Sequence, residues 1–222
     1  ALVFPVERLV AAFAERGIDT LVDGAHAPGM LDLDLARLGA AYYTGNCHKW
    51  ICAPKGAAFL HVRRDRQAAI RPLSISHGAN SPRTDRSRFR LEFDWSGTDD
   101  PTAFLCVPEA IRFLGGLHPA GWPGLRASIH AAAVDAQRVL AAALRIPLPA
   151  PASMLGSMTS LPLPPAERPA PGALDPLQVS LFETQRIEVP VFPSPVGRVI
   201  RAAMPVYATT DDVTKLAGAL GR

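Results

Sequence analysis

Reactive side chains are concentrated in two short runs near the start of the chain. Asp23 and His26 belong to an Asp-Gly-Ala-His run, and Asn46, His48 and Lys49 belong to a Gly-Asn-Cys-His-Lys run. A lysine amine can form an imine with a carbonyl group, and a carboxylate can stabilise a neighbouring positive charge. Imidazole and amide groups can donate hydrogen bonds to a phosphate. The two runs therefore contain the groups that chemistry at an amino group requires.

Lysine is scarce in this sequence, which narrows the choice of an amine nucleophile. Of the 23 basic residues only three are lysines, namely Lys49, Lys55 and Lys215. Lys55 follows a proline and is typical of a turn, and Lys215 falls on the polar face of the last expected helix. Lys49 is therefore the candidate nucleophile.

The combination of an amine, an acid and phosphate donors indicates pyridoxal 5'-phosphate (PLP) as a cofactor. PLP enzymes hold the cofactor as a Schiff base with a lysine, and an acid keeps the pyridine nitrogen protonated. We expect Lys49 to form the Schiff base and Asp23 to lie beside the pyridine nitrogen. His26 could stack on the ring or bond its phenolic oxygen, and Asn46 and His48 could donate to the phosphate. Taken alone, each run also fits a structural role, because Asp-Gly pairs often form turns and lysines often lie at the surface.

The elements expected around these runs alternate between helix and strand. The apolar spacing predicts helices over 5–17 and 33–38 and buried strands over 18–22, 41–44 and 56–62. This alternation favours a largely parallel α/β sheet, in which ligands bind beyond the carboxyl ends of the strands. Asp23 and the run 45–49 both follow such ends, so we expect them to converge on one site.

The second half of the chain reads as a small α+β domain. A long Arg- and Ser-rich connection over 71–100 and a helical stretch from Asp100 that is interrupted at Pro108 lead into it. The further predicted elements are helices over 125–144 and 175–184, strands over 157–161, 187–191 and 199–205, and a last helix with a Thr209–Asp212 capping box. The expected domains are therefore 1–115, the carboxyl-terminal part of a large PLP-binding domain, and 116–222, a small α+β domain.

Composition excludes several classes of protein. The chain has 222 residues, 48% of them hydrophobic, which suits a globular core, and it has no apolar run or leader pattern typical of a membrane span or signal peptide. Its net charge of +3 comes from basic residues that are spread along the chain, so we expect no nucleic-acid partner. Three cysteines are too few for a disulfide framework and favour a cytoplasmic location. The start at Ala-Leu-Val-Phe-Pro reads as an internal cut.

Three motifs, in order along the chain, resemble those of the class V aminotransferase family. They are Asp23-Gly-Ala-His-Ala27, Thr44-Gly-Asn-Cys-His-Lys-Trp50 and Pro54-Lys-Gly-Ala-Ala-Phe59, and the version with His-Lys-Trp is most similar to isopenicillin N epimerase-like proteins. The resemblance covers essentially the whole chain and implies the carboxyl-terminal portion of a PLP-dependent transferase fold. It implies the same roles for Lys49, Asp23, His26 and His48, while Asn46 stands where many relatives carry serine.

The resemblance also implies two contacts outside these runs. Gly97-Thr98 is similar to the family segment that crosses a dimer interface, so Thr98 would reach the partner's cofactor phosphate in a homodimer. Arg201 is similar to the family arginine that binds the α-carboxylate of an amino-acid substrate, for which a planar guanidinium is well suited. The four arginines over 83–90 are typical of a solvated loop and could also face an anionic substrate.

Several reactions and one other class of protein remain open. Proton removal at the α-carbon is shared by epimerases, aminotransferases and carbon–sulfur lyases. A cysteine desulfurase also needs a nucleophilic cysteine, and 182–200 contains none. A zinc site built from His26, Cys47, His48 and Cys52 has no usual ligand spacing, so we expect no metal. A catalytically inactive fragment is the third alternative, because relatives carry roughly another half-chain before the equivalent of Ala1. The substrate stays open.

Overall fold

The computed structural model describes residues 1–167, 169–195 and 197–221. The chain forms two compact units, one of Pro5–Leu114 and one of Ala1–Phe4 with Gly115–Arg222. Ala1–Phe4 belongs to the second unit because Leu2 forms a β-bridge with Leu155 and the Val3 N–H donates to the Met154 carbonyl over 2.7 Å.

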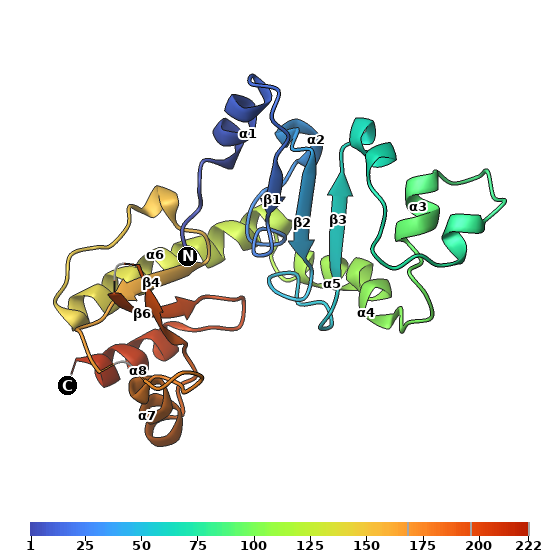
Figure 1. Ribbon diagram of the computed structural model, residues 1–222. Coiled ribbons are helices and arrows are strands. Elements are labelled where there is room, and N and C mark those ends of the chain that lie inside the picture. The colour runs from blue at the N-terminus through green and yellow to red at the C-terminus, as the bar shows by residue number, and fades with distance from the viewer. Residues whose placement is uncertain (168, 196, 222) are drawn as a thin grey trace. The chain divides into compact units, whose positions relative to one another are not determined.

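A three-stranded sheet in the order β1-β2-β3 forms the centre of the first unit (Figure 1). β1 (Leu21–Asp23) pairs in parallel with β2 (Tyr42–Asn46), and β3 (Ala58–Val62) pairs antiparallel with β2. The parallel arrangement expected from the sequence therefore holds for β1 and β2 and is wrong for β3. The loop 47–57 contains no helix, and a parallel neighbour would need a longer crossover connection.

β1 is shorter and more exposed than the buried strand predicted over 18–22. Ile18 lies before the strand and is 49% exposed, and Leu21 within it is 68% exposed. The cause is its place in the sheet, because β1 is an edge strand and no strand of the described residues pairs with its outer side. Its apolar sequence, which is typical of a buried strand, is therefore only partly covered.

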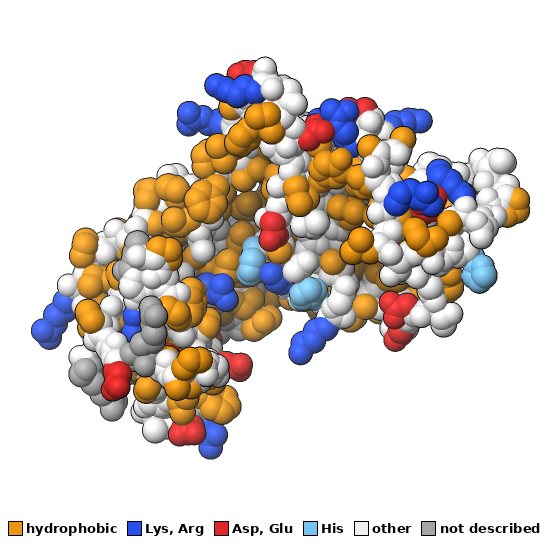
Figure 2. Space-filling view, viewed as in Figure 1, with side chains coloured by type: hydrophobic (Ala, Val, Ile, Leu, Met, Phe, Trp, Pro, Cys, Tyr) orange, Lys and Arg blue, Asp and Glu red, His pale blue; other side chains and the backbone are white. Residues whose placement is uncertain are grey.

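Short helices complete the first unit. They are α1 (Val6–Ala14), α2 (Leu35–Leu38), η1 (Arg64–Ala69), η2 (His77–Asn80), α3 (Arg88–Phe93), α4 (Thr102–Leu105) and α5 (Val107–Gly115). The Asp34 side chain caps α2 and Gly39 ends it with a left-handed φ of +70°. α1 buries only Val10 of its apolar stripe, and Figure 2 shows hydrophobic side chains exposed around this helix. α4 ends at Leu105 and α5 begins at Val107, so the helical stretch is interrupted just before Pro108, as the sequence predicts.

The connection over 71–100 contains two short helices, η2 and α3. η2 and α3 pack so closely that a Cβ on Gly78 would lie 1.7 Å from the Leu91 carbonyl oxygen. Glu92, which is 5% exposed, forms ion pairs with Arg71 and Arg88, and Arg88 also donates to the Gly78 carbonyl over 3.0 Å.

The second unit is an antiparallel sheet in the order β4-β6-β5 with helices packed on it (Figure 1). Its elements are α6 (Gly121–Leu144), η3 (Ala152–Met154), β4 (Met158–Pro162), α7 (Pro176–Gln185), β5 (Val191–Ser194), β6 (Gly197–Ala203) and α8 (Thr210–Leu220). Apolar side chains of α6, β4, β6 and α8 form one core, in which Leu140, Leu161 and Ile200 are fully buried. The predicted capping box of Thr209 and Asp212 is present. This unit has the α+β architecture expected from the sequence.

The strand predicted over 187–191 is wrong in position, because β5 begins only at Val191. The Ile187 N–H donates to the Leu181 carbonyl at the end of α7, and Pro190 has no N–H for a sheet. Helix α6 begins four residues before its predicted start, since Pro123 falls in its first turn, where proline is tolerated. Within the described residues, no helix combines the length and apolar character needed to cross a membrane.

Candidate active site

The parallel pairing of β1 and β2 brings the two reactive runs to the same edge of the sheet. Asp23 is the last residue of β1 and pairs with Thr44 of β2. The Gly24 N–H donates to the Thr44 carbonyl over 2.9 Å, which extends the pairing by one residue. Asn46 ends β2 opposite Ala58 of β3. The convergence expected from the sequence is therefore a feature of the structure.

Backbone hydrogen bonds hold the loop 47–57, which carries His48 and Lys49. The Ala57 carbonyl accepts from the Cys47 N–H at 2.9 Å and the His48 N–H at 3.3 Å, and it lies 3.2 Å from His48 Nδ1. The Ala53 N–H closes the loop on the Cys47 carbonyl at 3.0 Å. Lys49 is half-buried in this loop, and among the described residues its ammonium group makes no ion pair or hydrogen bond.

A side-chain hydrogen bond joins this loop to the run that contains Asp23. Trp50 Nε1 donates to His26 Nδ1 over 3.4 Å. The two backbones also approach closely, because a Cβ on Gly29 would lie 2.8 Å from the carbonyl carbon and oxygen of Trp50. Gly29 has a φ of +83°, which glycine adopts without strain. The two runs are therefore interlocked.

Two stacked aromatic rings from β2 and β3 lie next to these loops and were not predicted from the sequence. The Tyr43 ring, 3% exposed, stacks on Phe59 with centroids 6.2 Å apart and planes at 8°. A Cβ on Gly24 would lie 2.0 Å from the Tyr43 hydroxyl oxygen, and one on Gly45 would lie 2.5 Å from the Phe59 ring. Burial and then the negative charge of Asp23 raise the pKa of Tyr43, so the phenol stays neutral beside the carboxylate. The sequence feature that could have indicated this close packing is the glycine near the end of each strand, Gly24 after β1 and Gly45 in β2.

The chemical character of the site residues fits PLP. Asp23 is exposed, and its Oδ1 accepts from the Ala25 N–H at 3.0 Å. Lys49 supplies the amine, and His48 and Asn46 supply possible phosphate donors. Burial raises the pKa of the Cys47 thiol, which keeps it protonated and poorly nucleophilic.

The other residues predicted for the site lie in different segments. Gly97, with a φ of +136°, and the exposed Thr98 lie between α3 and α4. Arg201 lies on β6 in the second unit, where its guanidinium is 5.6 Å from the centroid of the Phe192 ring. A cation over an aromatic face is attracted to the ring, so this contact restricts the guanidinium.

The arginines over 83–90 are mainly paired with acids of their own segment. Arg83 binds Asp85 over 2.6 Å, and Arg88 binds Glu92 over 3.0 Å. These pairings favour the interpretation as a solvated loop and speak against a site for an anionic substrate.

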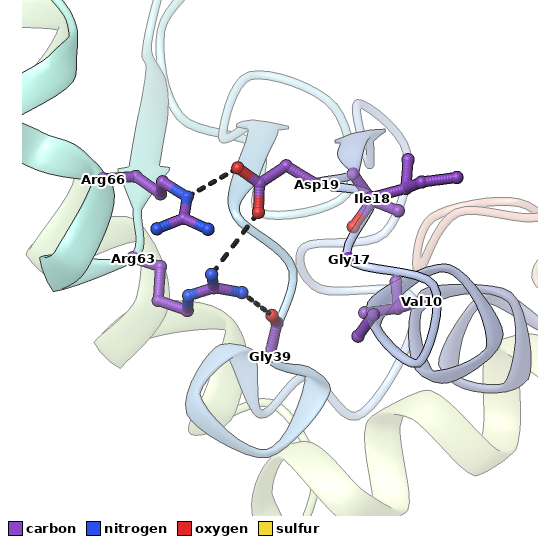
Figure 3. A pocket seen from close by; sticks show the side chains of 9 residues that line it. Val10, Gly17, Ile18, Asp19, Gly39, Arg63 and Arg66 are labelled. Atoms are coloured by element: carbon purple, nitrogen blue, oxygen red, sulfur yellow. Dashed lines mark hydrogen bonds and ion pairs between the residues drawn. The ribbon is translucent and has the colours of Figure 1, made fainter.

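A small cavity of about 100 Å³ lies at the opposite edge of the first sheet (Figure 3). Asp19, which precedes β1, binds Arg66 over 2.5 Å and Arg63 over 3.4 Å. Arg63 also donates to the Gly39 carbonyl over 3.0 Å. These arginines are paired within the cavity, and none of the residues that line it belongs to the two reactive runs. In the described part of the chain, no group of three or more His, Cys, Asp or Glu residues is placed to hold a metal ion.

Comparison with known proteins places these features in a family. The model of the family described as aminotransferase class V matches residues 2–161. Isopenicillin N epimerase of Amycolatopsis lactamdurans is 37% identical over 99% of this chain and 56% of its own length. A putative L-cysteine desulfhydrase of Oryza sativa subsp. japonica is 35% identical over 74% of this chain and 33% of its own length.

Solved structures share the fold. A cysteine desulfurase from Thermococcus onnurineus, 19% identical, superposes with a TM-score of 0.78 over 99% of this chain and 56% of its own. A C-DES variant with glycine covalently linked to its PLP cofactor is 22% identical, with a TM-score of 0.75 and the same coverage. These neighbours support the PLP-dependent transferase fold expected from the sequence. The chain spans about half the length of the relatives it matches.

Proposed function

Because the chain belongs to the aminotransferase class V family, we propose that it is part of a PLP-dependent enzyme that acts at the α-carbon of an amino acid. The observation that carries this proposal is the convergence of Asp23 and the Lys49 loop at one edge of the sheet. PLP-bound relatives of the same fold support PLP as the cofactor. In this proposal 1–115 belong to the PLP-binding domain and 116–222 form the small domain.

Each residue of the site has a distinct role in the proposal. Lys49 binds the cofactor covalently, Asp23 stabilises the protonated pyridine nitrogen, and His26 contacts the ring. His48 and Asn46 donate to the phosphate, and Arg201 binds the substrate carboxylate. PLP, when bound, supplies an electron sink that stabilises negative charge at the α-carbon. Once a substrate amino group has displaced Lys49 from its bond to the cofactor, the freed Lys49 amine could hold or return the proton at that carbon.

An epimerase-like reaction is the first candidate, because isopenicillin N epimerases match nearly the whole chain. An aminotransferase would use the same residues. The second candidate is a carbon–sulfur lyase, which the resemblance to cysteine desulfhydrases supports. A cysteine desulfurase is less well supported, because Phe182–Ile200 contains no cysteine.

The length of the relatives bears on whether this chain works alone. Since the chain spans about half of them, the site of the complete enzyme would include residues from the rest of the fold. We propose a homodimer in which Thr98 reaches the partner's phosphate, on the resemblance of Gly97-Thr98 alone. The alternative is that the isolated chain folds but is inactive.

Borohydride trapping of PLP tests the central assignment. Purified chain is mixed with PLP and reduced, and the labelled lysine is identified by peptide mass spectrometry in wild type, Lys49→Ala and Lys55→Ala. Lys55 is a matched control, because it is an exposed lysine of the same loop. We expect the label on Lys49 in wild type and in Lys55→Ala, and its loss in Lys49→Ala.

The outcomes separate the alternatives. Equal labelling of Lys55 and Lys49 would contradict a specific site. Labelling of Lys49 without turnover of any amino acid would favour the inactive fragment. If Lys49 is labelled, isomerisation, transamination and sulfide release from amino-acid substrates can be compared directly.

A further inference from the structure

The hydrogen bond between Trp50 and His26 has a fixed direction. An indole nitrogen can only donate, so His26 Nδ1, which lies 3.4 Å from Trp50 Nε1, is the acceptor. An imidazole nitrogen that accepts carries no proton, and the neutral ring then has its proton on Nε2. The contact therefore selects one of the two neutral tautomers of His26.

The backbones that carry the two side chains are held by other contacts. The close approach of Gly29 to the Trp50 carbonyl fixes one side, and the neighbouring Ile51 is 8% exposed. The Cys52 N–H donates to the Lys49 carbonyl over 3.2 Å and holds the other side. Replacing the indole by a phenyl ring would therefore remove the hydrogen bond to His26, while these backbone contacts keep the loop in place.

We propose that Trp50 is a positioning residue that holds His26 as the Nε2–H tautomer and so fixes the donor that His26 offers to the cofactor ring. The part that concerns the cofactor rests on the proposed function, whereas the tautomer is a property of the chain itself. The Nε2–H group can donate a hydrogen bond to an acceptor such as a phenolic oxygen. In the opposite tautomer Nε2 has no proton and could not donate. Trp50 directly follows Lys49, so the same bond links the lysine loop to the Asp23 run.

Nitrogen-15 NMR of the complete chain without cofactor tests the tautomer. Long-range ¹H–¹⁵N spectra are recorded at about pH 8, above the ordinary histidine pKa, for wild type, Trp50→Phe and Trp95→Phe. His26→Gln assigns the signal. Trp95→Phe is the matched control, since this tryptophan is 48% exposed and lies between α3 and α4. We expect His26 to be protonated only at Nε2 in wild type and the control, and to populate both tautomers in Trp50→Phe.

A cofactor measurement on the same proteins tests the positioning role. We expect the dissociation constant of PLP to rise in Trp50→Phe as the inverse of the fraction of His26 that keeps its proton on Nε2, which is about twofold for equally populated tautomers, and to stay unchanged in Trp95→Phe. A proton on Nδ1 in wild type, or an unchanged tautomer in Trp50→Phe, would overturn the proposal. A changed tautomer with unchanged PLP affinity would overturn the positioning role. Failure of wild type to bind PLP would count against the proposed function, while the NMR spectra would still decide the tautomer.

Discussion

At the scale of single residues, two glycines determine how closely the reactive runs approach the sheet. Gly24 accommodates the hydroxyl end of Tyr43, and Gly45 accommodates the Phe59 ring. Interiors are packed without spare volume, so an added methyl group must displace its neighbour. The proposed position of Asp23 therefore depends on Gly24, which has no side chain that could react.

Gly24→Ala is predicted to destabilise the fold. The new Cβ would lie 2.0 Å from the Tyr43 oxygen, and relief of such overpacking costs about 1–3 kcal/mol of the free energy of unfolding. Urea titration measures this cost. Gly218→Ala is the control, because its Cβ meets nothing within 4 Å on helix α8, and it should be neutral or stabilising. Equal stabilities of Gly24→Ala and wild type would show that Tyr43 moves at no cost.

At the scale of elements, one ion pair joins α7 to β6. Asp175 caps α7 by accepting from the Leu177 N–H, and both its oxygens accept from Arg198 over 2.6 Å. Asp175 is 6% exposed. The Arg198 hydrogen bonds, above all, lower the pKa of the Asp175 carboxyl below its usual 3.8. This residue therefore stabilises the fold in its charged form.

Asp175→Asn is predicted to lower the free energy of unfolding by about 3 kcal/mol at neutral pH, because it leaves a half-buried guanidinium without its partner. A lowered pKa contributes stability above the unfolded-state pKa and loses it as pH falls through the folded-state pKa. The difference from wild type, measured by urea titration, should therefore shrink as pH falls below about 4. Asp135→Asn, which breaks an exposed pair with Arg138, should cost less than about 0.5 kcal/mol. A pH-independent difference would show that the charge of Asp175 contributes nothing.

Local patterns predicted most helices well and the strand pairings less well. The capping box of α8 and the break at Pro108 are set by residues close in sequence, so they could be predicted. The exposure of Leu21 depends on which strand lies beside β1, and the local sequence carries no such information. The antiparallel β3 could have been expected, because the loop 47–57 is too short for a parallel crossover. The approach of the Asp23 run to the loop that carries Lys49 followed from the parallel β1–β2 pair. The contacts of Trp50 and Tyr43 depend on tertiary packing and were not foreseen.

At the scale of the whole molecule, the exposed edge of β1 is the surface through which we expect this chain to associate with another chain. An edge strand presents unpaired backbone groups, and apolar side chains beside it favour association with another chain. Leu21 is 68% exposed on this strand. The chain spans 56% of the length of the isopenicillin N epimerases that it matches.

The isolated chain is predicted to self-associate through this edge. Sedimentation velocity over roughly tenfold ranges of concentration should show association of wild type and its reduction in Leu21→Lys, because a charged edge residue opposes strand pairing. Leu73→Lys is the control, since Leu73 is fully exposed outside any strand. Equal association of Leu21→Lys and wild type would place the contact on another surface.

The antiparallel turn from β2 into β3 has a consequence for the order of folding. The loop with Lys49 connects the two strands of a hairpin. Because these strands are close in sequence, closing the loop between them costs little conformational entropy. Local pairings of this kind form earlier than pairings between distant segments. The loop with Lys49 is therefore expected to form before β1 pairs with β2. Lys49 would then be in place before Asp23 during folding.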